Sequence, residues 1–148
     1  MRLNFTFVLF LALFVSCQQL NLDDEDADCD YSTCNGIEPF SATLNIYFTR
    51  NPKIDSTVIF VLSGYFEDFI VLDTISIDTI PDYRTKTYIV KDIGHYYTIV
   101  AQYIIGKDTF LAVDGNELAK KSYYECDSLC WKVTGENFNV KLKGYKSY

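Results

Sequence analysis

Residues 96–116 read YYTIVAQYIIGKDTFLAVDGN, which is two apolar runs separated by a short polar turn. Tyr, Ile, Val and Thr dominate the first run (96–105), and the second (109–113) contains Thr, Phe and Val; all of these side chains favour β-strands. A short loop with a glycine between two such runs, here 106–108, is typical of a β-hairpin. The Asp-Gly-Asn sequence at 114–116 predicts a turn that ends the second strand.

The same signals recur on both sides of this hairpin, and no segment of any length has a helical period. The run at 69–78 starts with apolar residues on both faces and then alternates. We expect short strands at 41–49, 57–63, 69–78, 85–91, 96–105, 109–113, 130–134 and 138–143. About eight strands at this spacing predict an all-β fold, an antiparallel β-sandwich formed by residues 31–148 as a single domain. A small β-barrel is the alternative.

The segment 58–115 resembles the prealbumin-like and Ig-like modules that are common in bacterial surface proteins. The resemblance is in the pattern of residues 97–103 (YTIVAQY), the hairpin loop after them, and residues 112–115 (AVDG). It implies a β-sandwich, but a shared fold does not imply a function.

The N-terminus has the pattern of an export signal. Arg2 precedes a run from Phe5 to Val15 that is apolar apart from Thr6, too short to span a bilayer but suited to a signal peptide. The run ends in Phe-Val-Ser-Cys at 14–17, which resembles the bacterial lipobox, although leucine is more usual than phenylalanine at its first position. The resemblance implies that residues 1–16 are a lipoprotein signal peptide and that Cys17 is acylated and inserts its acyl chains into a membrane.

Residues 17–30 form an acidic tether behind this cysteine. Six of the 20 acidic residues of the chain fall here: Asp23, Asp24, Glu25, Asp26, Asp28 and Asp30. This cluster resembles the surface-export signal of lipoproteins in Bacteroidota, which implies an outer-membrane, cell-surface location. A plain spacer on the periplasmic face is the alternative. From Tyr31 onward, 14 acids against 12 bases leave a net charge of −2, so the domain lacks the basic surface that nucleic-acid binding needs.

Four further cysteines flank the domain in two close pairs, Cys29 with Cys34 and Cys126 with Cys130. Exported proteins keep disulfides, and four cysteines allow three pairings. Proximity in sequence favours two local bridges. Bridges that join the two ends of the domain would close loops of nearly a hundred residues and stabilise the fold more. The wide spacing and the oxidising compartment make a zinc site less favoured, so we expect no metal.

No catalytic constellation stands out. His95 is the single histidine, and neither a nucleophile motif nor a phosphate-binding loop is present. We therefore expect no enzyme activity and no cofactor. The aromatic residues are the most suggestive feature, and four of them in or near turns are candidate ligand-binding residues: Tyr65, Tyr96, Tyr123 and Trp131.

These observations predict a non-catalytic envelope lipoprotein that binds or helps to assemble a protein partner. The alternative is a carbohydrate-binding accessory lipoprotein, because exposed aromatic rings stack on sugars as well as anchoring proteins. An unknown envelope protein or a glycan is therefore the expected partner.

Overall fold

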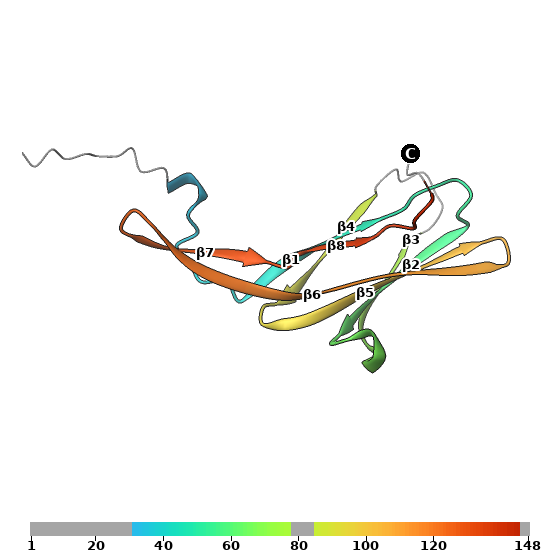
Figure 1. Ribbon diagram of the computed structural model, residues 1–148, viewed down its shortest axis with the longest axis horizontal. Coiled ribbons are helices and arrows are strands. Elements are labelled where there is room, and N and C mark those ends of the chain that lie inside the picture. The colour runs from blue at the N-terminus through green and yellow to red at the C-terminus, as the bar shows by residue number, and fades with distance from the viewer. Residues whose placement is uncertain (1–30, 78–84, 146–148) are drawn as a thin grey trace, which may run out of the picture. The chain divides into compact units, whose positions relative to one another are not determined.

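The alternating and two-sided apolar runs form eight β-strands in the computed structural model, which describes residues 31–77 and 85–145 (Figure 1). The strands are β1 (Ser41–Phe48), β2 (Ser56–Ser63), β3 (Ile70–Ile77), β4 (Lys86–Asp92), β5 (His95–Ile105), β6 (Asp108–Glu125), β7 (Ser128–Thr134) and β8 (Asn137–Val140). Two short 3-10 helices, η1 (Tyr31–Thr33) and η2 (Phe66–Asp68), complete the described elements. Each expected strand has a counterpart, and the predicted all-β sandwich of about eight strands is confirmed.

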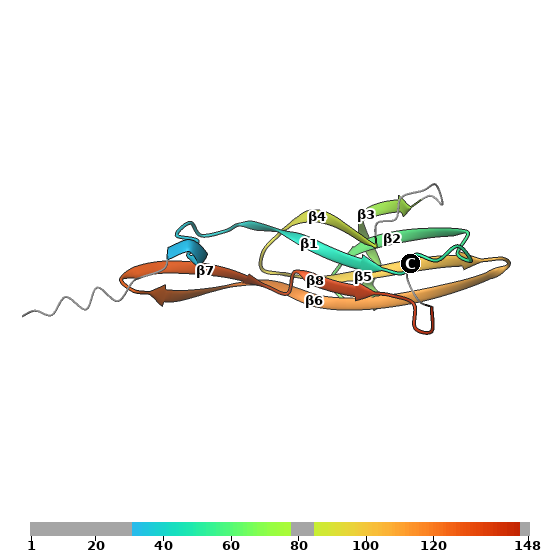
Figure 2. The same ribbon diagram turned by 90° about the horizontal axis from the view of Figure 1, so that it is seen from above.

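The strands form two sheets, a three-stranded sheet in the order β4-β1-β8 and a five-stranded sheet in the order β3-β2-β5-β6-β7. Figure 2 shows β1 and β4 on one side and β5 and β6 on the other. Neighbouring strands are antiparallel except β1 and β8, which run parallel. Over the described residues the sheets do not close, so the alternative of a small β-barrel is wrong. No helix in this part of the chain is long and apolar enough to cross a membrane.

The core lies between the facing sides of the two sheets. Alternate side chains of β1, β2, β5 and β8 point into it, because residues two apart in a strand share a face. The largest of the fully buried residues are Tyr103, Phe48, Phe138, Leu44, Ile46 and Ile59. Burying each aliphatic or aromatic side chain of this kind contributes roughly 1.5–3 kcal/mol, so this core is the main source of stability.

Tyr103 of β5 also ties the two sheets together through its hydroxyl group. The hydroxyl donates a hydrogen bond to the Val140 carbonyl at 2.7 Å and accepts one from the Thr49 amide at 3.0 Å. Tyr103 is fully buried, and burial raises the pKa of its hydroxyl. The side chain therefore satisfies two backbone groups that water cannot reach.

The prediction that a turn at 114–116 ends the second hairpin strand is wrong, because β6 continues through this sequence to Glu125. Gly115 lies within the strand, and a β-carbon there would stand 2.7 Å from the hydroxyl oxygen of Tyr96. Glycine in a strand often marks such a close approach. The glycine accommodates a neighbouring tyrosine ring and does not form a turn.

Candidate functional site

An unusual surface of the described residues is the segment Tyr65–Leu72, which includes most of the connection between β2 and β3 and the first three residues of β3; we call it the apolar tip. Gly64 precedes it with a φ of +78°; its amide donates a hydrogen bond to the Tyr96 carbonyl, and its carbonyl accepts one from the Thr98 hydroxyl. The helix η2 follows, and Phe69, the residue directly after its last residue Asp68, has a left-handed φ of 44° and ψ of 39°. This conformation costs a residue other than glycine roughly 1–2 kcal/mol. A glycine would be expected there on conformational grounds, but the chain has a phenylalanine.

Six of the eight residues in the apolar tip are large, apolar and exposed: Tyr65 (61%), Phe66 (39%), Phe69 (53%), Ile70 (58%), Val71 (43%) and Leu72 (44%). Scattered exposed apolar residues are normal, but a contiguous group marks an interaction surface. At roughly 150–200 Å² per side chain and about half exposure, the six present on the order of 500 Å² of mainly apolar surface. The sequence predicts apolar residues on both faces at the start of this strand but does not show that they are exposed.

Two of the predicted aromatic residues meet beside the apolar tip. The rings of Tyr65 and Tyr96 lie 4.5 Å apart between centroids, and the Tyr96 ring in turn covers Gly115. Tyr96 therefore supports Tyr65, which is the more exposed of the two. The adjacent Tyr97 is buried, and its hydroxyl donates a hydrogen bond to the Asp92 carbonyl at 2.9 Å.

The outer face of the five-stranded sheet extends this apolar surface. Val71 pairs with Leu62 of β2, and one row further along Phe60 pairs with Val100 of β5. Val100 pairs in turn with Val113 of β6, which is 46% exposed. Directly opposite residues in antiparallel strands share a face, so Val71 and Leu62 form an apolar pair, and Phe60, Val100 and Val113 form an apolar row across β2, β5 and β6. The apolar tip therefore adjoins a sheet face that is itself apolar.

Three acidic residues lie at or next to this surface, namely Glu67, Asp68 and Asp73. Asp73 of β3 forms an ion pair with Lys91 of β4, which joins the two sheets at this side. Glu67 and Asp68 in the apolar tip are exposed and form no ion pair within the described residues. The apolar tip thus presents two carboxylates that no cation of the described residues neutralises.

Tyr123 and Trp131 lie elsewhere, on the hairpin of β6 and β7, at the left of Figure 1. Tyr123 pairs with Cys130, so Tyr123 and Trp131 point to opposite faces of the hairpin. Lys120 lies over the Trp131 ring, with its Nζ atom 5.8 Å from the centroid. The structure therefore brings together Tyr65 and Tyr96 but not all four predicted aromatic residues.

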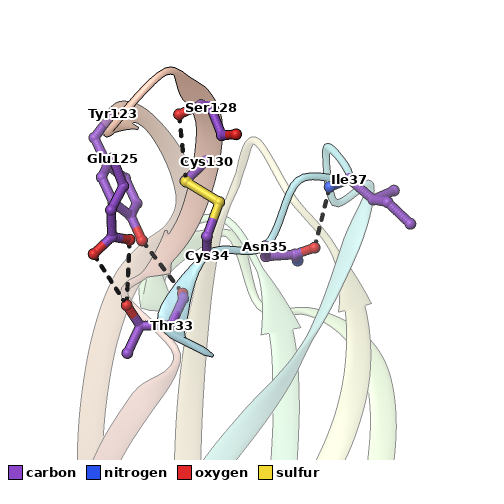
Figure 3. Close-up of a disulfide and its surroundings, with 8 residues drawn as sticks. All are labelled: Thr33, Cys34, Asn35, Ile37, Tyr123, Glu125, Ser128 and Cys130. Atoms are coloured by element: carbon purple, nitrogen blue, oxygen red, sulfur yellow. Dashed lines mark hydrogen bonds between the residues drawn. A yellow bond between two sulfur atoms is a disulfide. The ribbon is translucent and has the colours of Figure 1, made fainter. Parts of the chain in front are cut away.

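The hairpin also carries a disulfide between Cys34 and Cys130, 96 residues apart in sequence (Figure 3). The expectation of two local bridges is therefore wrong. The segment before β1 runs beside β7, where the Trp131 amide donates a hydrogen bond to the Asn35 carbonyl at 2.8 Å. This placement brings cysteines from the two ends of the domain together.

The remaining cysteines do not form a metal site in the described part of the chain. Cys126 is also disulfide-bonded, whereas Cys17 and Cys29 lie outside the described residues. In the described part of the chain, one cluster has the residue types of a metal site, namely Cys34, Cys130 and Glu125. Two of its three members form the disulfide, so their sulfur atoms are not thiolate ligands.

No family model, known protein or solved structure matches this chain. The function must therefore be argued from the geometry of its surface.

Proposed function

We propose that this chain is an outer-membrane lipoprotein, anchored by acyl chains on Cys17 and exposed at the cell surface, that acts as a non-catalytic binding or assembly module for a protein partner. The anchor and the location are inferred from the N-terminal sequence. The observation that carries the binding role is the apolar tip, with six exposed apolar side chains in eight consecutive residues.

The size and chemistry of the apolar tip support a protein as the partner. Its roughly 500 Å² is a large part of the about 800 Å² that each protein contributes to a standard interface. Leu111 (54%) and Val113 (46%) on the adjoining sheet face add to it. Aromatic residues are enriched at the centres of such interfaces, and the apolar tip supplies Tyr65, Phe66 and Phe69.

The backbone conformation of Phe69 also supports a binding role. A left-handed phenylalanine that is 53% exposed contributes little to the core, yet it carries a conformational cost. Such local strain is found where a side chain must be held in place for binding. We interpret Phe69 as an anchor residue for the partner.

Carbohydrate binding is the second candidate, and the observation that favours it is the exposed ring of Tyr65, which lies against the half-buried ring of Tyr96. A sugar platform usually needs several rings on one face, whereas Tyr123 and Trp131 lie on the separate hairpin. A glycan screen on the purified protein distinguishes the two hypotheses. Glycan binding that disappears in Tyr65→Ala would favour the sugar, and its absence would favour the protein partner.

The variant Phe69→Gly tests the binding role without damaging the fold. Glycine adopts the left-handed conformation readily, so we expect stability at least equal to that of the parent chain. Removing an interface anchor should weaken capture of the partner from cell extracts about tenfold or more, a loss that corresponds to at least about 1.4 kcal/mol. Tyr124→Ser is a matched control, because Tyr124 is 76% exposed but lies on the β6–β7 hairpin. Equal capture by Phe69→Gly and the parent would refute the proposal.

A further inference from the structure

Four strands lie at the ends of the two sheets in the described part of the chain, namely β4, β8, β3 and β7, and three of them are protected. β4 carries Lys86 and Lys91, and β8 is only four residues long and is followed by Lys141. β7 carries Lys132, and its edge is partly covered where the Trp131 amide bonds to the segment before β1. Lysines, short strands and covering segments are the usual devices that prevent an edge from pairing with another chain.

β3 is the fourth edge, and its eight residues include no lysine, arginine, proline or glycine. A bulge falls near its start, because the pairing with β2 shifts between Asp73 and Val71. The stretch Asp73–Ile77 after the bulge is regular. In an antiparallel sheet, alternate residues of an edge strand point both their N–H and C=O groups outward, so about half of this stretch is open to a new partner.

The side chains of β3 define what such a partner should look like. Ile75 and Ile77 pack against the core from the inner face, while Thr74 and Ser76 are exposed on the outer face. The carboxylate of Asp73, the one charge on the strand, is neutralised by Lys91. A partner strand that alternates apolar and hydroxyl-bearing residues would match both faces.

The apolar tip adds an electrostatic requirement at one end of this edge. Glu67 and Asp68 are separated from β3 by Phe69 alone and lack an ion-pair partner in the described part of the chain. The β3 strand of a second copy would bring no cation to them. A strand from a different protein that ends in lysine or arginine would neutralise the two carboxylates. This favours a different protein over a second copy of the chain as the partner.

We propose that an extended segment of the partner protein adds to the edge of β3 as a sixth, antiparallel strand of the five-stranded sheet. Its backbone pairs with Asp73–Ile77, and a basic residue near its C-terminal end lies against Glu67 and Asp68. This inference rests on the proposed function and names the part of the partner that is recognised. Strand addition of this kind takes its affinity from main-chain hydrogen bonds and its specificity from flanking side chains, which the apolar tip supplies.

The test uses a fluorescein-labelled peptide, Ser-Val-Thr-Val-Thr-Val-Lys-Lys, and the purified chain in an anisotropy titration. We expect saturable binding. The affinity should fall about tenfold or more when proline replaces the second threonine of the peptide, since proline cannot donate a hydrogen bond to the neighbouring strand. Replacing both lysines of the peptide by glutamate should weaken binding at least about threefold, and added salt should reduce this difference. No binding, or equal binding of the proline peptide, would overturn the proposal.

Variants of the chain locate the peptide. Thr74→Lys with Ser76→Lys places on β3 the charges that protect the other edges, and should weaken binding about tenfold. Ser122→Lys, at an exposed position of β6 that pairs with Trp131 of β7 and not with β3, should leave it unchanged. Hydrogen exchange of the bound complex should show new protection of amides within residues 73–77. Protection confined to β4 or β7 would overturn the assignment to β3.

The same variants separate this proposal from the proposed function. If Phe69→Gly abolishes capture of the partner and the double lysine variant does not, the apolar tip remains the docking surface but strand addition is wrong. If neither variant affects capture, the proposed function fails as well. A dimer of the unliganded chain in sedimentation that the double lysine variant disrupts would assign the edge to a second copy and overturn the heterologous partner.

Discussion

Replacing Tyr103 by phenylalanine tests how the two sheets are held together. The variant keeps the ring in the core but removes the hydroxyl that bonds to the Thr49 amide and the Val140 carbonyl. Thr49 and Val140 are 1% and 0% exposed, so water cannot replace the lost bonds. Each buried polar group left unsatisfied costs about 1–3 kcal/mol, and we expect Tyr103→Phe to lower the free energy of unfolding by about 2–4 kcal/mol.

Urea unfolding followed by tyrosine and tryptophan fluorescence measures this loss, and the slope of the transition should not change. For a domain of this size the melting temperature should fall by roughly 8–16 °C. Tyr97→Phe is the matched control, because Tyr97 makes a single hydrogen bond to the Asp92 carbonyl and should lose about 1 kcal/mol. A loss below about 0.5 kcal/mol for Tyr103→Phe would refute the role assigned to this hydroxyl.

Three further predictions concern stability. Burial raises the pKa of Tyr103 above its ordinary value of 10.0, so the hydroxyl loses its proton at a lower pH in the unfolded chain than in the folded one. The free energy of unfolding should therefore be constant with respect to this group below about pH 10 and fall above it. Urea unfolding at several pH values should show a smaller fall for Tyr103→Phe. Replacing Cys34 and Cys130 by serine removes a disulfide between residues 96 positions apart and should lower the free energy of unfolding by at most about 4.7 kcal/mol. The loss should be smaller while the disulfide of Cys126 is intact. Unchanged stability under non-reducing conditions would contradict this. Gly135→Ala would place a β-carbon 1.9 Å from a backbone oxygen of β6 and should lower the free energy of unfolding by about 2 kcal/mol or more. Gly94 also has a positive φ but no atom near its β-carbon position, so thermal melts of Gly94→Ala should show about half that loss of stability.

The strands could be predicted from the sequence because their burial follows a local rule. Leu44 and Ile46 alternate with Thr43 and Asn45, and one side of such a strand must face a core. The end of β6 could not be predicted in this way. Asp-Gly-Asn is a common turn sequence, and only the position of the Tyr96 ring shows why Gly115 is needed inside a strand.

The disulfide and the apolar tip depend on contacts that a local reading does not contain. Cys130 meets Cys34 because the β6–β7 hairpin lies beside the segment that leads into β1. Residues 69–72 have the apolar pattern of a buried strand. They lie at the start of β3, which is at the edge of its sheet, and their side chains are exposed. Periodicity identifies a strand as apolar on both faces without showing whether another layer covers it.

The central claim is that the apolar tip binds a protein partner, and site-specific photo-crosslinking in intact cells tests it most directly. The benzophenone amino acid p-benzoylphenylalanine replaces Phe69 in one variant and Tyr124 in another. Both positions are exposed, Tyr124 the more so, but they lie on different elements. We predict a discrete adduct with one protein from position 69, identified by mass spectrometry, that is lost when Phe66 and Ile70 are both changed to serine. Adducts of equal yield from both positions, or none from position 69, would contradict the account.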